Sequence, residues 1–311
     1  MRHIIPISGK DSLTTALVVI GEREREKQES DLEFIYNDTG AELPETYEWL
    51  SKVESQLGIK ITHIGKDLTG LIENTGMLPS AKARYCTRQA KIEPMIKFLK
   101  GDECNVYFGI RADENRIGFQ NGQAENITPI YPLKEKGINL YMVYAILEKQ
   151  NLLPPTFFWK EIHTEVVNRV GIEIVSSLKK WNFDALFSWR SRPNCYFCFY
   201  QRIYEWVGLL EHYPNLFEKA VILEESNGQE GGDDIIEFMA LFGREFKTGE
   251  KGSFNWHENL PLRKIAEKKE HYKEMRVRAI VDILRKMQQQ SIFEKDEIEL
   301  SGTSCGMFCG K

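Results

Sequence analysis

The chain has 311 residues, of which 42% are hydrophobic and 28% charged, with a formal net charge of −5. This balance is typical of a soluble globular protein, and it excludes a protein that is basic over its whole surface. No run of about 18 apolar residues occurs, so we expect no membrane span, and the apolar start is too short for a signal peptide. We therefore expect a cytoplasmic protein, in which six cysteines are better explained by metal or redox chemistry than by disulfides.

Short apolar runs alternate with helical patterns in the first half of the chain. Strands are predicted over residues 3–7, 32–36, 59–64 and 105–109, and helices over 12–28, 44–57 and 88–100. Pro44 suits the first turn of its helix, and Gly58 suits the position after its end. Alternation of this kind predicts an α/β fold with a mostly parallel, doubly wound sheet. Ligands of such sheets bind at the carboxyl ends of the strands.

The second half of the chain is richer in helical patterns. Helices are predicted over 139–151, 160–181, 201–212 and 262–289, and the acidic, glycine-containing stretch 224–237 is predicted to be a loop. We expect two domains: an α/β domain over 1–200 that ends in a Cys-x-x-Cys segment, and a mainly helical region over 201–311 with a cysteine-containing tail. The helical stretch 134–190 has no predicted role.

The first segment with chemical character follows the first strand and precedes the first helix. It reads Ser8-Gly9-Lys10-Asp11-Ser12. Small residues let backbone N–H groups approach an anion, and the helix N-terminus and Lys10 add positive charge, which suits a phosphate. The Walker spacing G-x-x-x-x-G-K is absent. The segment alone is equally compatible with a plain turn capped by Asp11 or Ser12.

A second polar segment follows the second strand and contains Asp38, Thr39, Gly40 and Glu42. Because the segment lies at a neighbouring strand end, Asp38, Thr39 and Glu42 could bind a ribose, the shell of a Mg²⁺ ion or a second substrate. An ordinary turn with capping residues is the alternative.

Together the two segments resemble the PP-loop ATP pyrophosphatases, and specifically the branch of phosphoadenosine phosphosulfate (PAPS) reductases. That branch has a Ser-Gly-Gly-Lys-Asp-Ser-like loop, whose leading Ser and first Gly fall on Ile7 and Ser8 here. Three further segments agree: Arg-Tyr-Cys-Thr-Arg over 84–88 with Lys-Ile-Glu-Pro over 91–94, Phe-Gly-Ile-Arg-Ala-Asp-Glu over 108–114, and Arg-Pro-Asn-Cys-Tyr-Phe-Cys over 192–198. Within the branch, the chain looks most like the DndC- and SspD-type DNA phosphorothioation enzymes.

The resemblance implies that ATP and Mg²⁺ bind at these loops and that AMP is transferred to an acceptor. In the DNA-modifying relatives the acceptor is a DNA backbone phosphate, and a cysteine desulfurase partner supplies the sulfur. The implied catalytic residues are Lys10, Asp11, Asp38, Arg111 and, in one alternative, Cys305. The implied nucleotide-binding residues are Ser8, Gly9, Lys10, Asp11, Ser12, Asp38, Thr39, Gly40, Glu42, Arg111 and Glu114, and the arginines expected to hold a phosphate or sulfate are Arg190 and Arg192.

Four of the cysteines form close pairs, Cys195/Cys198 and Cys305/Cys309. Such pairs suit Zn²⁺, an iron–sulfur cluster or a redox dithiol, and a cluster needs about four thiolates. The resemblance favours a [4Fe–4S] cluster, with Cys86 as a rival ligand, and leaves Zn²⁺ as the alternative. Buried inert thiols are the remaining interpretation.

Two other functions remain open. The chain could be a PAPS or APS reductase, with Cys305 as nucleophile, thioredoxin as reductant and sulfite as product. It could also be a nucleotide-binding module without turnover. A basic stretch over 263–286, with nine Lys/Arg and four Asp/Glu, favours DNA binding, although a solvated helix face has the same pattern.

Overall fold

The fold is built on a five-stranded, all-parallel sheet in the order β3-β2-β1-β4-β5. The computed structural model describes residues 1–27, 31–81, 83–119, 124–227, 255–257 and 260–291. The strands are β1 (Arg2–Pro6), β2 (Leu32–Asn37), β3 (Ile61–Ile64), β4 (Cys104–Tyr107) and β5 (Ile127–Ile130). The predicted α/β class and parallel sheet are confirmed. The sequence patterns did not predict β5, because four residues that include Thr128 and Pro129 give no strand periodicity.

Both faces of the sheet are covered, which explains why its strands read as continuous apolar runs. Ile5 and Phe34 belong to one core with α1 (Lys10–Glu26), α2 (Pro44–Leu57), α6 (Pro132–Glu135) and α7 (Leu140–Lys149). Ile4 and Ile35, which alternate with them, belong to the opposite core with Met95 of α5 (Glu93–Phe98). The elements that precede α5 are α3 (Leu68–Thr75), α4 (Tyr85–Thr87) and the π-helix η1 (Arg88–Ile92).

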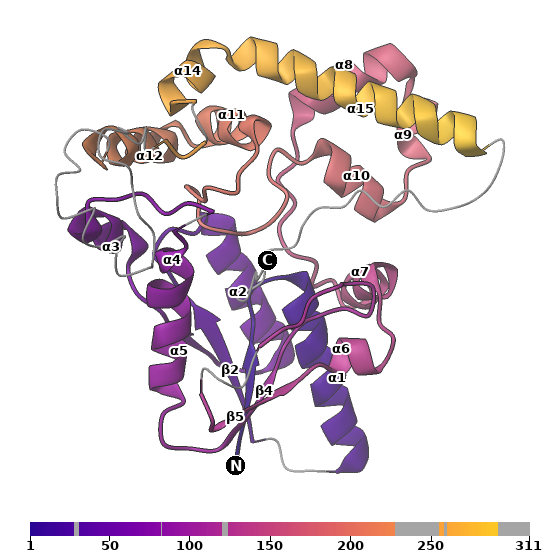
Figure 1. Ribbon diagram of the computed structural model, residues 1–311. Helices are drawn as coiled ribbons and strands as arrows, with labels where there is room; N and C mark the ends of the chain where they lie inside the picture. Colours follow the sequence, from indigo (N-terminus) through magenta and orange to yellow (C-terminus); the bar gives the residue numbers. More distant parts are fainter. Residues whose placement is uncertain (28–30, 82, 120–123, 228–254, 258–259, 292–311) are drawn as a thin grey trace.

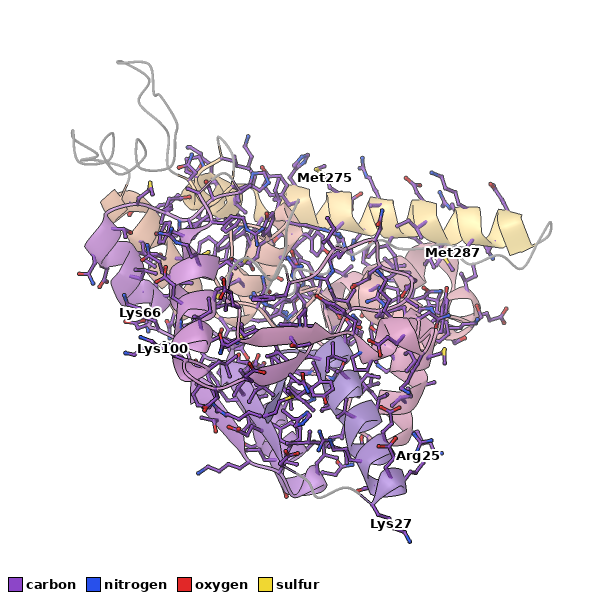
Figure 2. All side chains as sticks on the ribbon, turned by 60° about the horizontal axis from the view of Figure 1, so that its bottom comes forward. Arg25, Lys27, Lys66, Lys100, Met275 and Met287 are labelled. Atoms are coloured by element: carbon purple, nitrogen blue, oxygen red, sulfur yellow. The ribbon has the colours of Figure 1, made fainter. Side chains whose placement is uncertain are left out.

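A helical layer lies over the carboxyl ends of the strands, above the sheet in Figure 1. Its helices are α8 (Lys160–Val170), α9 (Ile172–Ser176), α10 (Lys180–Phe187), α11 (Ile203–His212), α12 (Pro214–Asn227), α14 (Leu262–Glu267) and α15 (Lys269–Ser291). Arg25 and Lys27, near the end of α1, project on the opposite side of the molecule from Met275 of α15 (Figure 2). The N-terminus of α1 therefore points toward the helical layer.

Three predictions for the helical half need correction. The helix expected over 160–181 is divided into α8, α9 and α10, and Gly171 with a φ of 89° ends the first. The basic segment is likewise divided, since α14 ends at its C-cap Lys268 and α15 begins next to it. Residues 224–227 belong to α12, whereas 228–237 lie outside the described residues.

The helical layer begins before residue 201. Ile162 and Val166 of α8 share one core with Val277, Ile280 and Leu284 of α15. Residues 160–187 therefore pack with the C-terminal helices, and the boundary at residue 200 stays a prediction. None of the helices in the described part of the chain is long and apolar enough to cross a membrane.

The buried carboxylate of Glu224 joins α12 to α14. Its two oxygens accept the backbone N–H groups of Trp256, at 2.9 Å, and Leu262, at 2.7 Å. We expect Glu224→Ala to lower the free energy of unfolding by roughly 2–4 kcal/mol, because two buried N–H groups lose their acceptors. Urea unfolding measures this.

The matched control is Glu225→Ala, which removes an exposed ion pair with Arg263. Its cost should stay below about 1 kcal/mol. Equal losses in the two variants would contradict the role of Glu224.

Candidate active site

A cavity of about 670 Å³ lies between the strand ends and the helical layer. From β1 the chain continues to β2 and β3 on one side of the sheet, whereas β4 and β5 lie on the other side of β1. The strand order therefore reverses between β1 and β4. Such switch points are the usual ligand sites of open α/β sheets. The predicted site residues that line this cavity are Ser8, Gly9, Lys10, Asp11, Ser12, Glu42, Cys86, Arg111, Arg190, Arg192, Cys195 and Cys198.

The phosphate-type loop forms where β1 passes into α1. The backbone N–H groups of Ser8 and Gly9 both donate to Ser12 Oγ, at 2.9 and 3.1 Å. Two amide donors therefore converge on one point at the N-terminus of a helix of 17 residues. Such an arrangement suits an anion, which would replace the hydroxyl as acceptor. Ser8 keeps the amide donor that a glycine would supply at this position.

Gly109 brings the end of β4 against this loop. A Cβ atom at Gly109 would lie 2.6 Å from the backbone nitrogen of Ser12 and 2.7 Å from the carbonyl carbon of Asp11. A glycine is thus needed for the close approach. The approach places Arg111, two residues later, beside Asp11.

Two cations flank the Asp11 carboxylate. Lys10 Nζ lies 2.9 Å from Asp11 Oδ2, and Arg111 Nη1 lies 3.2 Å from Asp11 Oδ1. Burial alone would lower the pKa of Arg111, but the charge of Asp11 and the hydrogen bond to Asp113 outweigh it and raise the pKa. Arg111 is therefore a fixed positive charge. Glu114 Oε1 contacts it at 3.2 Å, so Glu114 supports Arg111 instead of facing the cavity.

In the second loop, Glu42 faces the cavity and its neighbours do not. Asp38 accepts hydrogen bonds from Gly40 N–H at 2.9 Å, Tyr47 Oη at 2.8 Å and His63 Nδ1 at 2.9 Å. Burial opposes its ionisation, but these hydrogen bonds outweigh burial and lower the pKa of Asp38.

Asp38, Thr39 and Gly40 do not line the cavity, and their direct contact with a nucleotide stays a prediction. Thr39 instead donates its hydroxyl to Glu42 Oε1 at 2.7 Å. The Thr39 and Ala41 N–H groups also donate to Glu42 Oε2, and this orients the Glu42 carboxylate. The three residues thus shape the loop around Glu42.

Three of the predicted metal ligands lie on one wall of the cavity. Cys195 Sγ is 3.2 Å from Thr39 Oγ1, and the N–H of Tyr196 donates to Ala41 O at 2.7 Å, so the Cys-x-x-Cys loop is docked on the second loop. Cys86 comes to the same wall from α4. Burial raises the pKa of the Cys195 thiol to about 12 and that of Cys86 to about 11. Cys305 and Cys309 lie outside the described residues.

Lys91 places an ammonium group beside these thiols and was not among the predicted site residues. Burial by itself would lower the pKa of Lys91, but Cys195, Glu42 and the other two thiols outweigh it and raise the pKa. Lys91 lies in the π-helix η1, and such single-turn distortions are frequent at functional sites. Its Lys-x-x-Pro motif was the available sequence signal. A cation here would stabilise ionised thiols.

Among the described residues, no group of three or more His, Cys, Asp or Glu side chains is arranged so that it could hold a metal ion. Cys86, Cys195 and Cys198 nevertheless supply soft donors of the right kind, with a compensating cation beside them. Thiolates are the usual ligands of iron–sulfur clusters and zinc ions, and a metal on this wall stays a prediction.

Arg190 supports the Cys-x-x-Cys loop. Its guanidinium is 1% exposed and donates to the carbonyl oxygens of Arg192, Asn194 and Cys195 and to Gln201 Oε1. Most of its donors are therefore used within the protein, which differs from the anion contact expected of it. Arg192 lines the cavity and stays a predicted anion ligand.

Part of the basic segment 263–286 is neutralised by contacts in the helical layer. Lys273 pairs with Glu161 at 2.6 Å and Glu211 at 2.8 Å, and Arg263 pairs with two carboxylates of α12. Arg276 donates to the backbone oxygens of Ala185 and Leu186 and lines the cavity. The cations of the segment thus differ in their surroundings, with Lys268, Arg285 and Lys286 exposed, and DNA binding by the segment stays a prediction.

Residues 2–152 match the family model described as "Phosphoadenosine phosphosulfate reductase domain". The match covers slightly less than half of the chain. It supports the PAPS reductase family for this part of the protein, and the motifs of the first half resemble the same family.

Two relatives are uncharacterized proteins of Methanocaldococcus jannaschii, each 26% identical to the chain. One aligns over 68% of the chain and 38% of its own length, the other over 84% and 54%. The chain thus spans about a third to a half of these relatives. The crystal structure of phosphoadenylyl-sulfate (PAPS) reductase from Candida auris, in its phosphate complex, is 18% identical with a TM-score of 0.38, over 50% of this chain and 74% of that chain.

Replacement of Gly109 tests the geometry of the phosphate loop. We expect Gly109→Ala to weaken ATP binding by about tenfold or more, because the added Cβ pushes the backbone of Asp11 and Ser12 away. Isothermal titration calorimetry measures the affinity. Gly21→Ala, on α1 with no atom within 4 Å of the new Cβ, is the control and should bind like the wild type. Unchanged binding by Gly109→Ala would refute the assignment.

Proposed function

We propose that this protein cleaves ATP between its α- and β-phosphates and transfers AMP to an acceptor oxygen, as the activating step of sulfur incorporation. The observation that supports this most is that one cavity contains both the cations of a phosphate-type loop and three cysteine thiols. Lys10 and Arg111 lie at the phosphate-type loop, and Cys86, Cys195 and Cys198 line the same cavity. An adenylylated acceptor would therefore form in the same cavity as these three thiols.

The charge of the cavity suits a polyanion. Nine lining residues are cationic and four are acidic. The cations are Lys10, Arg84, Lys91, Arg111, Arg116, Arg190, Arg192, Arg202 and Arg276, and the acids are Asp11, Glu42, Asp184 and Glu205. Cations on both sides of the loop favour an acceptor that is itself anionic, and we propose a DNA backbone phosphate.

In the proposed reaction, the acceptor oxygen bonds to the α-phosphorus while the bond to the bridging oxygen breaks and pyrophosphate leaves. Lys10 and Arg111 neutralise the charge that develops on the leaving group. The Asp11 carboxylate, which lines the cavity between these cations, would hold Mg²⁺ together with the phosphates. AMP is then the leaving group when a sulfur nucleophile bonds to the activated centre.

The thiols would hold a [4Fe–4S] cluster, with Zn²⁺ as the alternative, and Cys305 or Cys309 as candidates for the remaining ligand. A cluster at this wall would supply redox chemistry and a place to hold sulfur. Lys91 would compensate the negative charge of the thiolates. The sulfur would come as a persulfide from a cysteine desulfurase, with a thiol reductant to release it.

The family match of residues 2–152 favours a second candidate, a PAPS or APS reductase. Here the Cys305 thiolate attacks the sulfur of the sulfonucleotide, an S–S bond forms and the nucleotide leaves. The dithiol of thioredoxin then reduces that bond and releases sulfite. A nucleotide-binding module without turnover is the third candidate.

Loss of the Lys10 charge should slow pyrophosphate release from ATP. We expect Lys10→Ala to reduce the rate by roughly 100-fold or more, because a fixed cation no longer stabilises the transition state. A coupled pyrophosphate assay with single-stranded DNA, ATP and a sulfur donor measures it. Lys66→Ala, an exposed lysine outside the cavity, is the control and should keep the wild-type rate.

The same preparation separates the two enzymes. Sulfite release from PAPS with thioredoxin, together with no phosphorothioate from ATP and DNA, would replace the proposed function by the reductase.

Removal of a wall thiol should abolish iron binding. We expect anaerobically purified wild-type protein to contain iron and sulfide, and Cys195→Ala or Cys198→Ala to lose both. Uptake should rise with pH, because the raised pKa values of Cys195 and Cys86 keep these thiols protonated near neutrality and metal binding must displace their protons. Iron and sulfide analysis measures the content.

Cys104→Ala is the matched control, since Cys104 lies in β4 outside the cavity. Stoichiometric zinc without iron or sulfide in the wild type would replace the cluster by a zinc site.

A further inference from the structure

An aromatic wall lines the cavity beside the phosphate loop. Tyr141 of α7 and Trp181 of α10 have ring centroids 4.6 Å apart at an interplanar angle of 67°, and Tyr144 lies 6.2 Å from Trp181. All three line the cavity and are half-buried, so part of each ring surface is accessible from it. Neither the phosphate loop nor the thiols contribute to this wall, and the proposed activation step does not use it.

The wall and the thiols lie on opposite sides of the phosphate loop. α7 packs with α1 in the core on one face of the sheet, whereas α5, which continues from the Lys91 segment, belongs to the core on the other face. Figure 1 likewise shows α7 and α4 on opposite sides of the sheet. Tyr144 lines the same cavity as Lys10 and Asp11 of the phosphate loop. A ligand that spans the cavity would therefore contact the thiols, the loop and the rings in that order.

A lysine lies over the aromatic wall on the solvent side. Lys179 Nζ is 5.0 Å from the centroid of Trp181 and 5.7 Å from that of Tyr141. Lys179 is exposed and does not belong to the lining of the cavity. An exposed cation–π contact of this kind is weak, so the ammonium can turn to an anion that lies beside the rings.

We propose that Tyr141 and Trp181 form a stacking subsite for an unpaired nucleobase of a nucleic-acid strand, with Lys179 contacting the adjacent backbone phosphate. Base stacking on aromatic side chains beside a cation is a general mode of single-strand recognition. The phosphates of the activating nucleotide are already accounted for by Lys10 and Arg111. ATP carries phosphates only on its 5′ oxygen, so a further cation beyond the rings suits the backbone phosphate of a strand. The proposal rests on the proposed function and specifies its acceptor as single-stranded at this point.

Replacement of Trp181 tests the subsite. We expect Trp181→Ala to weaken binding of a fluorescein-labelled single-stranded DNA oligonucleotide by roughly 5- to 150-fold, the range for loss of one stacked base. Trp181→Phe keeps a flat ring and should restore most of the affinity. Lys179→Ala should flatten the dependence of affinity on salt, because one phosphate contact is lost. Fluorescence anisotropy at several salt concentrations measures all three variants.

Met142→Ala is the matched control, because Met142 is exposed on α7 and does not line the cavity. If Trp181→Ala unfolds, as circular dichroism would reveal, Tyr141→Ala provides the same test. ATP affinity is measured on the same proteins and should not change. Unchanged oligonucleotide binding by a folded variant overturns the subsite, and loss of ATP affinity alone overturns it by assigning the wall to the adenine ring. Failure of the wild type to release pyrophosphate would refute the proposed function without affecting the binding test.

Discussion

The close approach of the β4 end to the phosphate-type loop is the contact on which the candidate site depends. Gly109 meets the backbone of Ser12 at a distance that admits no side chain, and two strands that are far apart in sequence thereby end at one point. Lys10 and Arg111 reach the same carboxylate because of this approach. A site for transferred phosphate needs such fixed charges before the substrate arrives, since charges already in place need little rearrangement during the reaction.

A second docking contact joins the sheet to the helical layer. The N–H of Tyr196 donates to Ala41 O, and Arg190 holds the carbonyl groups of the Cys-x-x-Cys loop. Because Arg190 is buried, its removal would leave several carbonyl groups without donors as well as a gap in the packing. The thiol wall is therefore held in place by the core of the protein.

Burial and the charge of Lys91 have opposite effects on the protonation of the cavity thiols. Burial keeps the Cys195 and Cys86 thiols protonated, as their raised pKa values indicate, while Lys91 favours their ionised form. The Cys195 and Cys86 thiols are thus neutral in the free protein, and the proposed metal would displace their protons. On the other side of the loop the cavity is lined by the rings of Tyr141, Tyr144 and Trp181, so its two ends differ in chemical character.

The amino-acid sequence by itself determined the parallel α/β architecture, the position of the phosphate-type loop and the Cys-x-x-Cys segment. These depend on local periodicity and on residues that are neighbours in the chain, such as Ser8 to Ser12. Element boundaries in the helical half were less predictable, since a backbone turn at Gly171 divides a pattern that reads as one helix.

The tertiary structure alone decided which side chains meet. Asp38 follows a strand as Glu42 does, yet hydrogen bonds from Tyr47 and His63 hold it away from the cavity. Lys273 belongs to a basic stretch, but two acids from other helices neutralise it. Lys91 and Trp181 reach the cavity from elements that local patterns do not relate to it. The physical reason is common to all of these: a side chain's partners are set by long-range packing, and periodicity along the chain holds no information about that packing.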